Sequence, residues 1–451
     1  TVDDKNPRCE AIAISDGRIM ATGTSDEIKA LQGDDTEMID AEGKFVMPGF
    51  IEGHGHFPGL GNSLQNLNFL KSRSWQEIVD AVKAKVDESE PGEWIIGRGW
   101  HQEKWQDTLM ENVLGYPYHD ALSAISPENP VMLTHASGHA LFANKAAMAK
   151  AGMTNETQNP SGGNIVRGPS GEAIGVFEEN AMGIIRDAYR EYTATLTEDE
   201  MVQLWYDGIQ LAEDECLRKG VTSFQDAGSS LFEMDRLAKL ADDGELDIRV
   251  WAMIRHVHSY LNDKLGKYPI IDKGDGFFTC RAIKLSIDGA LGSYGAWLLE
   301  PYSDNPGFYG QNTSSIEELN LLAELSLEHD MQLCVHAIGD RANREVLDAY
   351  GAALDKSGKS PETFRWRVEH SQHLHPDDIP RFAEYGVIAS MQGIHCTSDA
   401  PFVEKRLGEQ RAREGAYVWK SLLESGAVVT NGTDAPVEDV DPIESFYATV
   451  T

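Results

Sequence analysis

The sequence predicts an α/β fold, a TIM-like (β/α)8 barrel with a small β-module ahead of it and a long insertion after the first barrel strand. From residue 196 onward, apolar strand-like runs alternate with helical stretches, which is typical of βα units around a parallel sheet. A polar residue closes nearly every run, and barrel enzymes carry their active sites at the carboxyl ends of the strands. We therefore expect a site built from strand ends.

Each barrel strand is predicted from a short apolar run. The first lies in Pro48–Phe57, and the other seven are Val221–Asp226, Ile248–Ile254, Ala282–Asp288, Gln332–His336, Arg365–His370, Val387–Met391 and Ala427–Asp434. The polar residues that close them are His54, His56, Asp226, Asp288, His336, His370 and Asp434. A helix expected over Thr197–Lys219 ends before Gly220, a residue suited to terminating helices.

Two regions fall outside this strand count. In residues 1–47, apolar runs break at Asp16–Gly17 and at Glu42–Gly43, which predicts two hairpins of a small antiparallel sheet. Residues 60–190 are predicted to be an insertion, because the run Pro130–His135 would be a ninth strand. The insertion holds a helix expected over Ser74–Asp87, and we expect it to cover the active site. Residues 48–59 and 191–451 supply the barrel.

Composition narrows the class of protein. The formal net charge of -34, from 73 acidic and 39 basic residues, disfavours nucleic acid and anionic membranes as partners. No run of eighteen apolar residues suggests a membrane span, and the first residues lack the pattern of a signal peptide. The five scattered cysteines argue against a disulfide framework, so we expect a cytoplasmic protein. Barrel enzymes often pair, so a homodimer is expected, and the expected partner is a small-molecule substrate.

The strand ends carry residues that bind metals. His54 and His56 are two apart in a strand, so both imidazoles face the same way and can hold one ion, with Gly53 and Gly55 leaving room for it. His336 and His370 can hold a second ion, and Asp434 supplies an oxygen facing the metal-bound water. Two ions held close together also need a bridging group.

Lys284 is the candidate for that bridge. It lies in the middle of an apolar strand, where a protonated amine is costly to bury, and buried lysines tend to lose their proton. A neutral amine can add carbon dioxide to form a carbamate, whose two oxygens can bridge two metals. An ordinary lysine reaching out from the strand is the alternative.

At these residues the chain resembles the amidohydrolase superfamily, in the amidohydrolase-3 branch that includes YtcJ-like proteins and N-substituted formamide deformylases. The resemblance covers nearly the whole chain. The motifs that carry it are Pro48–His56, Gly138–Ala140, Ile283–Ser293, His336–Asn343, Val368–His370 and Asn431–Pro436.

The resemblance implies a fold and a role for each motif residue. It implies that His54 and His56 bind the buried metal, that Lys284 is a carboxylated bridge, and that His336 and His370 bind the second metal. Asp434 would be both metal ligand and catalytic acid/base. The ions would be two divalent metals, most simply zinc, and residues 1–47 would be the N-terminal part of a β-sandwich.

Other polar residues are open to two interpretations. His395, His139 and Asp288 are candidate substrate contacts, although each could instead be structural, with Asp288 capping its loop. His256, His258, His373 and His375 are expected to be surface or packing residues.

The expected function is metal-dependent hydrolysis of a carbon–nitrogen bond, in an amide or formamide-like group, through a metal-activated hydroxide with Asp434 as general acid/base. Two alternatives stay open. Related barrels also cleave esters or phosphotriesters, and a barrel that had lost its metals could serve as a non-catalytic binding module.

Overall fold

The chain folds as two compact units in a computed structural model, Thr1–Phe50 and Ile51–Thr451. The structure describes residues 1–102, 105–106, 111–113, 115–136, 138, 140–160, 163–292, 294–358 and 360–451.

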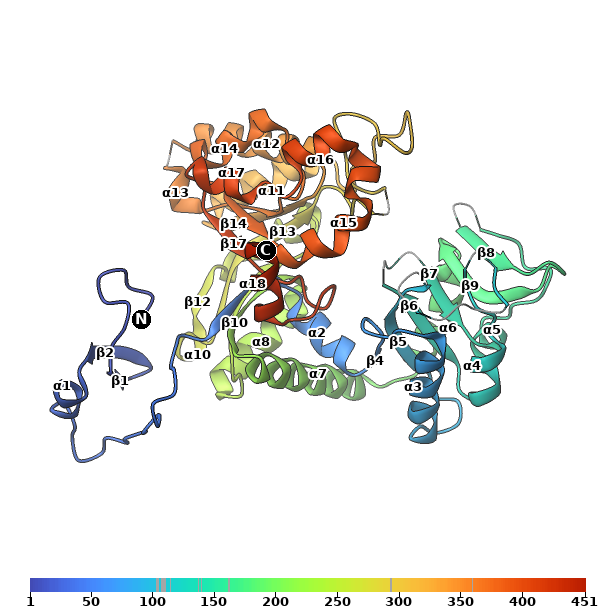
Figure 1. The fold of residues 1–451 in the computed structure, drawn as a ribbon, viewed down its shortest axis with the longest axis horizontal. Helices are drawn as coiled ribbons and strands as arrows, with labels where there is room; N and C mark the ends of the chain where they lie inside the picture. Colours follow the sequence, from blue (N-terminus) through green and yellow to red (C-terminus); the bar gives the residue numbers. More distant parts are fainter. Residues whose placement is uncertain are drawn as a thin grey trace. The chain divides into compact units, whose positions relative to one another are not determined.

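The first unit contains one hairpin and one short helix (Figure 1). Strands β1 (Ala11–Ser15) and β2 (Arg18–Gly23) pair antiparallel, and α1 (Ser25–Lys29) follows. The turn between the strands uses positive φ at Asp16 and Gly17, which small turn residues tolerate. The first predicted hairpin is therefore present.

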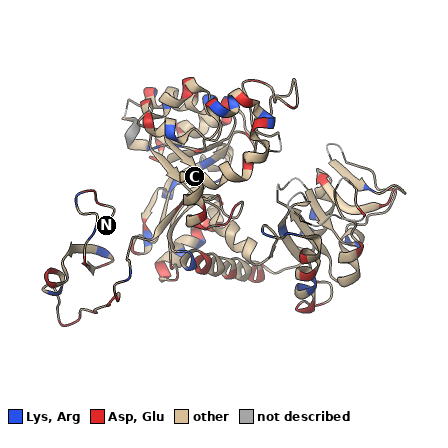
Figure 2. Ribbon diagram, in the orientation of Figure 1, with Lys and Arg blue, Asp and Glu red and all other residues tan. Residues whose placement is uncertain are grey.

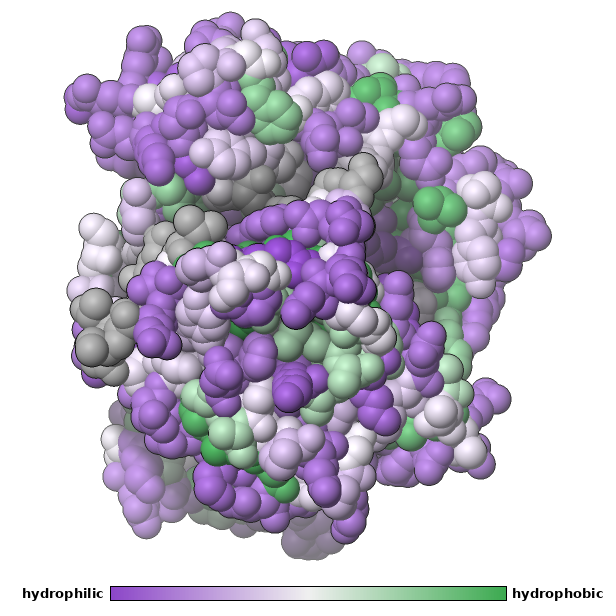
Figure 3. All heavy atoms as spheres, turned by 90° about the vertical axis from the view of Figure 1, so that its right-hand side faces the viewer, coloured by the Kyte–Doolittle hydropathy of each residue, from purple (hydrophilic) through white to green (hydrophobic). Residues whose placement is uncertain are grey.

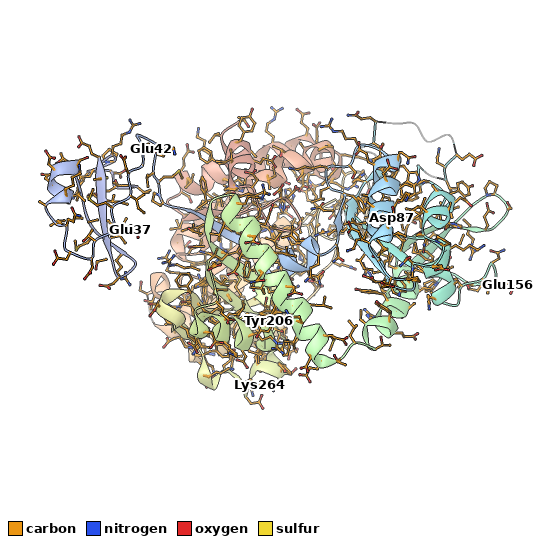
Figure 4. All side chains as sticks on the ribbon, turned by 90° about the horizontal axis from the view of Figure 1, so that it is seen from below. Glu37, Glu42, Asp87, Glu156, Tyr206 and Lys264 are labelled. Carbon is orange, nitrogen blue, oxygen red and sulfur yellow. The ribbon has the colours of Figure 1, made fainter. Side chains whose placement is uncertain are left out.

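The second predicted hairpin, over residues 38–47, is wrong. Glu42 and Gly43 do form a turn, but no strands flank it. Ile39 and Phe45 are 85% and 80% exposed, so the segment has no buried face to select a strand register. Glu37 and Glu42 mark this stretch in Figure 4.

The barrel sheet in the second unit confirms the predicted fold. Its hydrogen-bonded order is β17-β16-β15-β14-β13-β11-β10-β3, and the neighbouring pairs from β10 to β17 are parallel. The eight strands are β3 (Phe50–Gly55), β10 (Val221–Ser229), β11 (Arg249–Ile254), β13 (Phe278–Ser286), β14 (Gln332–Ala337), β15 (Arg367–His370), β16 (Ile388–Met391) and β17 (Val429–Asn431). Short β12 (Ile270–Asp272), which lies outside this strand order, pairs antiparallel with β13 through Ile270 and Cys280.

Backbone hydrogen bonds beyond the last strand bring the two ends of this sheet together. The amide of Asp434 donates to the carbonyl of His54 at 2.7 Å, and the amide of His56 donates to that of Ala435 at 2.6 Å. The sheet is thus nearly closed, and the loop that carries Asp434 is tied to the strand that carries both histidines.

Helices surround the barrel (Figure 1). The longest, α7 (Glu198–Arg218), is the predicted one; it begins at a capping box on Thr197, and Tyr206 marks it in Figure 4. The others are α8 (Leu231–Asp243), α9 (His258–Leu261), α10 (Lys273–Gly276), α11 (Ile316–Glu328), α12 (Asp340–Ser357), α13 (Pro361–Phe364), α14 (Ile379–Glu384), α15 (Gly393–Leu407), α16 (Glu409–Gly415), α17 (Trp419–Glu424) and α18 (Pro442–Val450), with 3-10 turns at Leu265–Lys267 and Pro376–Asp378.

The segment between β3 and β10 builds a second sheet with its own core. The sheet order is β4-β5-β6-β7-β9-β8, with β4, β5 and β6 parallel and the rest antiparallel. The elements are α2 (Phe57–Leu64), β4 (Leu67–Asn68), α3 (Trp75–Asp87), β5 (Ile95–Trp100), α4 (Asp120–Ile125), β6 (Val131–His135), β7 (Ala140–Ala143), α5 (Lys145–Lys150), β8 (Gly163–Arg167), β9 (Ala173–Glu179) and α6 (Met182–Thr193).

Both faces of this second sheet are buried. Adjacent residues of β7 alternate between two apolar clusters: Phe142 packs with α3, and Leu141 packs with α5 and α6. The run Pro130–His135 therefore supplies a strand of this sheet, which is why it did not fit the barrel count.

Acidic residues are spread over the outer helices (Figure 2). Hydrophilic residues predominate on the face drawn in Figure 3, with hydrophobic residues scattered among them. Within the described part of the chain, we find no helix that is both long and apolar enough to cross a membrane.

Candidate metal centre

The first barrel strand delivers two histidines to the barrel interior. His54 is fully buried, and its ring centroid lies 5.8 Å from that of His56. The sequence suggested that Gly53 and Gly55 leave room for an ion, but the space beside each glycine is filled by protein atoms. A Cβ on Gly53 would lie 2.3 Å from the carbonyl oxygen of Asn431, and one on Gly55 would lie 2.6 Å from Phe224. These glycines are required because adjacent barrel elements pack directly against the strand.

His370 and Asp434 complete a compact group with His54. One nitrogen or oxygen from each lies within 4.8 Å of the others, and all three residues are buried. Both His370 and Asp434 have positive φ, 75° and 60°, an uncommon backbone state for residues other than glycine. Such strained conformations often occur at functional sites.

The carboxylate of Asp434 lies close to both histidines of the first strand. Its Oδ1 is 3.5 Å from Nε2 of His54 and 3.2 Å from Nε2 of His56. Burial would raise the pKa of Asp434, but the two histidines outweigh burial and hold that pKa well below its usual range. The carboxylate is therefore ionised, as a metal ligand must be.

His336 and Lys284 lie on the adjacent strands β14 and β13. The His336 ring centroid is 4.4 Å from that of His370. Lys284 is 2% exposed, and within the described ranges the structure gives it no hydrogen bond and no ion pair. Burial, assisted by the nearby Arg255 charge and opposed by Glu369, lowers the pKa of Lys284.

Side chains behind the histidines fix which nitrogen of each ring faces the site. Glu369 accepts from Nδ1 of His54 and is itself paired with Arg367, whose Nε lies 2.6 Å from its Oε1. Gln392 Oε1 lies 2.7 Å from Nδ1 of His370. In both histidines the Nε2 atom is left to face the centre, which is the arrangement used for metal-ligating imidazoles.

Sequence reasoning gave these three residues no role. The sequence did contain one indication of the pair: Arg367 and Glu369 are two residues apart in β15, so their side chains lie on the same face of a fully buried strand. A charged pair two residues apart in a fully buried strand must be paired inside the barrel. Gln392 carried no comparable signal.

Burial also sets the charge of two imidazoles. It lowers the pKa of His336 to about 3, helped by Lys284, and it lowers that of His370 well below its usual range, helped by His336. Both are neutral, the form that binds metals. His54 differs, because Glu369 and Asp434 outweigh burial and the Lys284 charge and raise its pKa.

Several buried polar atoms at this centre have no hydrogen-bond partner among the described residues. They are Nε2 of His54, Nε2 of His336, Nε2 of His395 and Oδ1 of Asp434. Because unpaired buried polar atoms are costly, their convergence on one place indicates a missing partner. Nitrogen and carboxylate donors of this kind suit a divalent ion such as zinc, so these residues fit a metal.

The three predicted substrate contacts differ in their surroundings. His395 is buried at the centre, with Nε2 3.9 Å from Oδ2 of Asp434 and Nδ1 bonded to Gln372. Asp288 accepts backbone N–H bonds from Trp297, Ile338 and Gly339, which favours the loop-capping alternative. Its Oδ1 also lies 3.5 Å from Nε2 of His336, so this carboxylate borders the centre. His139 lies outside the described residues.

The comparison with protein families decides where this chain belongs. Residues 37–451 match the family model Amidohydro_3, described as the amidohydrolase family. The chain belongs to the amidohydrolase family. This confirms the resemblance drawn from the motifs.

Three relatives match this chain along its whole length. It is 31% identical to Protein LONG AFTER FAR-RED 3 of Arabidopsis thaliana, covering 76% of that protein. It is 30% identical to Putative amidohydrolase YtcJ of Bacillus subtilis, covering 82%, and 25% identical to N-substituted formamide deformylase of Arthrobacter pascens, covering 81%.

A solved structure supports the same fold. An uncharacterized metal-dependent hydrolase from Pyrococcus horikoshii superposes with a TM-score of 0.75 at 27% identity. The match covers 97% of this chain and 81% of that protein. Family and neighbour together support a metal-dependent hydrolase.

Proposed function

We propose that this protein hydrolyses a carbon–nitrogen bond, in an amide or formamide-like group of a small organic molecule. The observation that carries the proposal is the buried convergence of His54, His370 and Asp434. Among the described residues, Nε2 of His54 and Oδ1 of Asp434 have no hydrogen-bond partner. The similarity to an N-substituted formamide deformylase supports the choice of a carbon–nitrogen bond.

Six residues would hold two divalent ions, with zinc as the expected metal: His54, His56, Lys284, His336, His370 and Asp434. Lys284 would act as a bridging carbamate. Its burial and lowered pKa support this role, because only the unprotonated amine can add carbon dioxide.

Bound divalent ions would supply Lewis acidity, lowering the pKa of a water and polarising the substrate carbonyl. The chain's own contribution to proton transfer is Asp434. Its ionised carboxylate takes the proton from the attacking water and returns it to the leaving nitrogen. His395, near Oδ2 of Asp434, is proposed to contact the substrate.

The first test is metal content and hydrolysis by the zinc-loaded protein and by Asp434→Asn. The wild type should bind zinc and hydrolyse members of an N-formyl and N-acyl amide panel. Asp434→Asn should retain most of its zinc and lose about 10²- to 10⁴-fold in turnover, the usual contribution of general acid/base catalysis. Substantial turnover by the zinc-loaded variant contradicts this role.

A panel of amides, esters and phosphotriesters separates the rival functions. Preference for esters or phosphotriesters would replace the carbon–nitrogen assignment. Zinc content near zero after purification with zinc supplied would indicate a non-catalytic barrel.

A further inference from the structure

Arg255, just beyond the end of β11, lies at the same level along the barrel strands as two of the proposed metal ligands. Met253, Ala282 and Cys334 belong to one buried cluster inside the barrel. Side chains two residues apart in a strand face the same side. The next layer toward the carboxyl ends of the strands therefore contains Arg255, Lys284 and His336.

Individual contacts agree with this layering. A Cβ placed on Gly228 would lie 3.1 Å from Cβ of Arg255 and 3.1 Å from Cγ of Lys284, so both side chains flank one glycine. Nη2 of Arg255 lies 3.1 Å from Oγ of Ser286, a residue in register with His336. The guanidinium thus lies at the level of the candidate metal centre.

Among the residues that the structure describes, Arg255 has no counter-ion. The residue is exposed, and within the described ranges its side chain makes the single hydrogen bond to Ser286 and no ion pair. Other arginines of this acidic chain pair with carboxylates, as in Arg218–Glu215, Arg381–Asp348 and Arg406–Asp304. A guanidinium has five N–H donors, so most of those on Arg255 are available to a ligand.

We propose that Arg255 is a specificity-determining residue that binds a carboxylate on the substrate, next to the carbon–nitrogen bond. The planar fork of a guanidinium matches the two oxygens of a carboxylate. This inference rests on the proposed function and narrows its substrate class to anionic amides. In this arrangement Arg255 binds the two oxygens of the substrate carboxylate. The centre formed by His54, His370 and Asp434 binds the carbonyl group whose carbon–nitrogen bond is cleaved.

The turnover experiment compares N-formylphenylalanine with N-formylphenylalaninamide, which differ only in the carboxylate. The zinc-loaded wild type should prefer the carboxylate compound in kcat/KM. Arg255→Met should lose about 10- to 100-fold on that compound, mainly through KM, because a charge-assisted hydrogen bond is removed. Its kcat/KM on the neutral amide should change little.

The matched control is Arg249→Met. Arg249 begins the same strand, at the opposite end of the barrel, and its guanidinium lies over the ring of Phe277. The control removes the same charge and should leave both kcat/KM values and the zinc content unchanged. Zinc loss by Arg255→Met alone, or an equal loss of activity on both compounds, overturns the proposal in favour of a role in holding the metal or the Lys284 carbamate.

A binding experiment separates failure of this inference from failure of the proposed function. Calorimetry on metal-free protein compares 3-phenylpropanoate with 3-phenylpropanamide, so neither turnover nor direct metal binding contributes. Tighter binding of the carboxylate by wild type and Arg249→Met, lost in Arg255→Met, supports the inference even if neither formyl compound is hydrolysed. Equal affinity for both probes in the wild type overturns it.

Discussion

At the scale of single residues, the site depends on what lies behind the histidines. His54 and His370 each use Nδ1 on a buried partner, Glu369 and Gln392, and thereby present Nε2. The Glu369 partner is held ionised because Arg367 and His54 outweigh its burial, which leaves its pKa well below the usual range. Orientation of the imidazoles is thus set by groups that are not proposed to touch metal.

Replacing Gln392 with methionine should weaken zinc binding about 10- to 100-fold, as loss of a supporting hydrogen bond does at metal sites. Methionine keeps the approximate volume but replaces the amide oxygen that bonds Nδ1 of His370 with a sulfur that is only a weak acceptor. Competition with a chromogenic chelator measures the affinity. Gln372→Met is the control, because buried Gln372 contacts His395 instead. Equal affinities in the two variants would contradict the orienting role.

A second residue-scale prediction concerns pH. Burial raises the pKa of Glu213 from 4.5 to about 7, although its carboxylate accepts from the Asp247 amide at 2.6 Å. Between these values the folded protein holds a proton that the unfolded chain has released. The free energy of unfolding contributed by Glu213 is therefore largest below pH 4.5 and falls as pH rises through that window.

Urea denaturation at pH 5 and pH 7.5 tests this contribution. Glu213→Gln should decrease less in stability between the two pH values than the wild type does. Glu328→Gln, on a helix end, should behave like the wild type. Parallel behaviour of all three proteins would show that Glu213 does not titrate in this window.

At the scale of elements, helices α2 and α7 approach so closely that a side chain is excluded. A Cβ on Gly61 of α2 would lie 2.2 Å from the carbonyl oxygen of Gly208 in α7. Because the obstacle is backbone, neither helix can relieve the contact by a change of rotamer. This packing connects the element after the first barrel strand to the helix before the second.

Gly61→Ala should lower the free energy of unfolding by about 1–3 kcal/mol, the usual effect of overpacking. Gly183→Ala in α6 is the matched control, since a Cβ there meets nothing within 4 Å. Alanine at Gly183 should be neutral or stabilise the protein by up to about 1 kcal/mol. Thermal and urea unfolding measure both, and equal effects would contradict the close approach.

At the scale of the whole molecule, charge repulsion is the dominant long-range effect. The formal net charge is -34, and Asp and Glu are spread over the outer helices (Figure 2). Self-repulsion of this kind destabilises a compact state and is screened by salt.

Raising sodium chloride from about 10 to 150 mM should therefore increase Tm, because the Debye length falls from roughly 30 to 8 Å. An equal osmolality of glucose serves as the control for effects other than screening. A Tm that does not change with salt would show that acidic side chains are already neutralised by local pairing.

The sequence by itself determined the barrel and the order of its strand-end residues. Alternation of apolar runs with helices is a local property, and so is the position of a polar residue at the end of a run. Residues such as His54, His336 and Asp434 could therefore be placed at one end of the barrel from the sequence alone. The motifs around them also indicated the family that the comparison confirms.

Only the tertiary structure decided how those strand ends are supported. Glu369 and Gln392 act on histidines of other strands, and the need for Gly53 arises from the carbonyl of Asn431, far away in the chain. The missing second hairpin has the same cause, because residues 38–47 contain strand-forming side chains but no buried face to receive them. Hydrophobic periodicity and composition are properties of a short stretch of sequence. Side-chain burial and side-chain pairing depend instead on which residues, distant in the chain, come into contact.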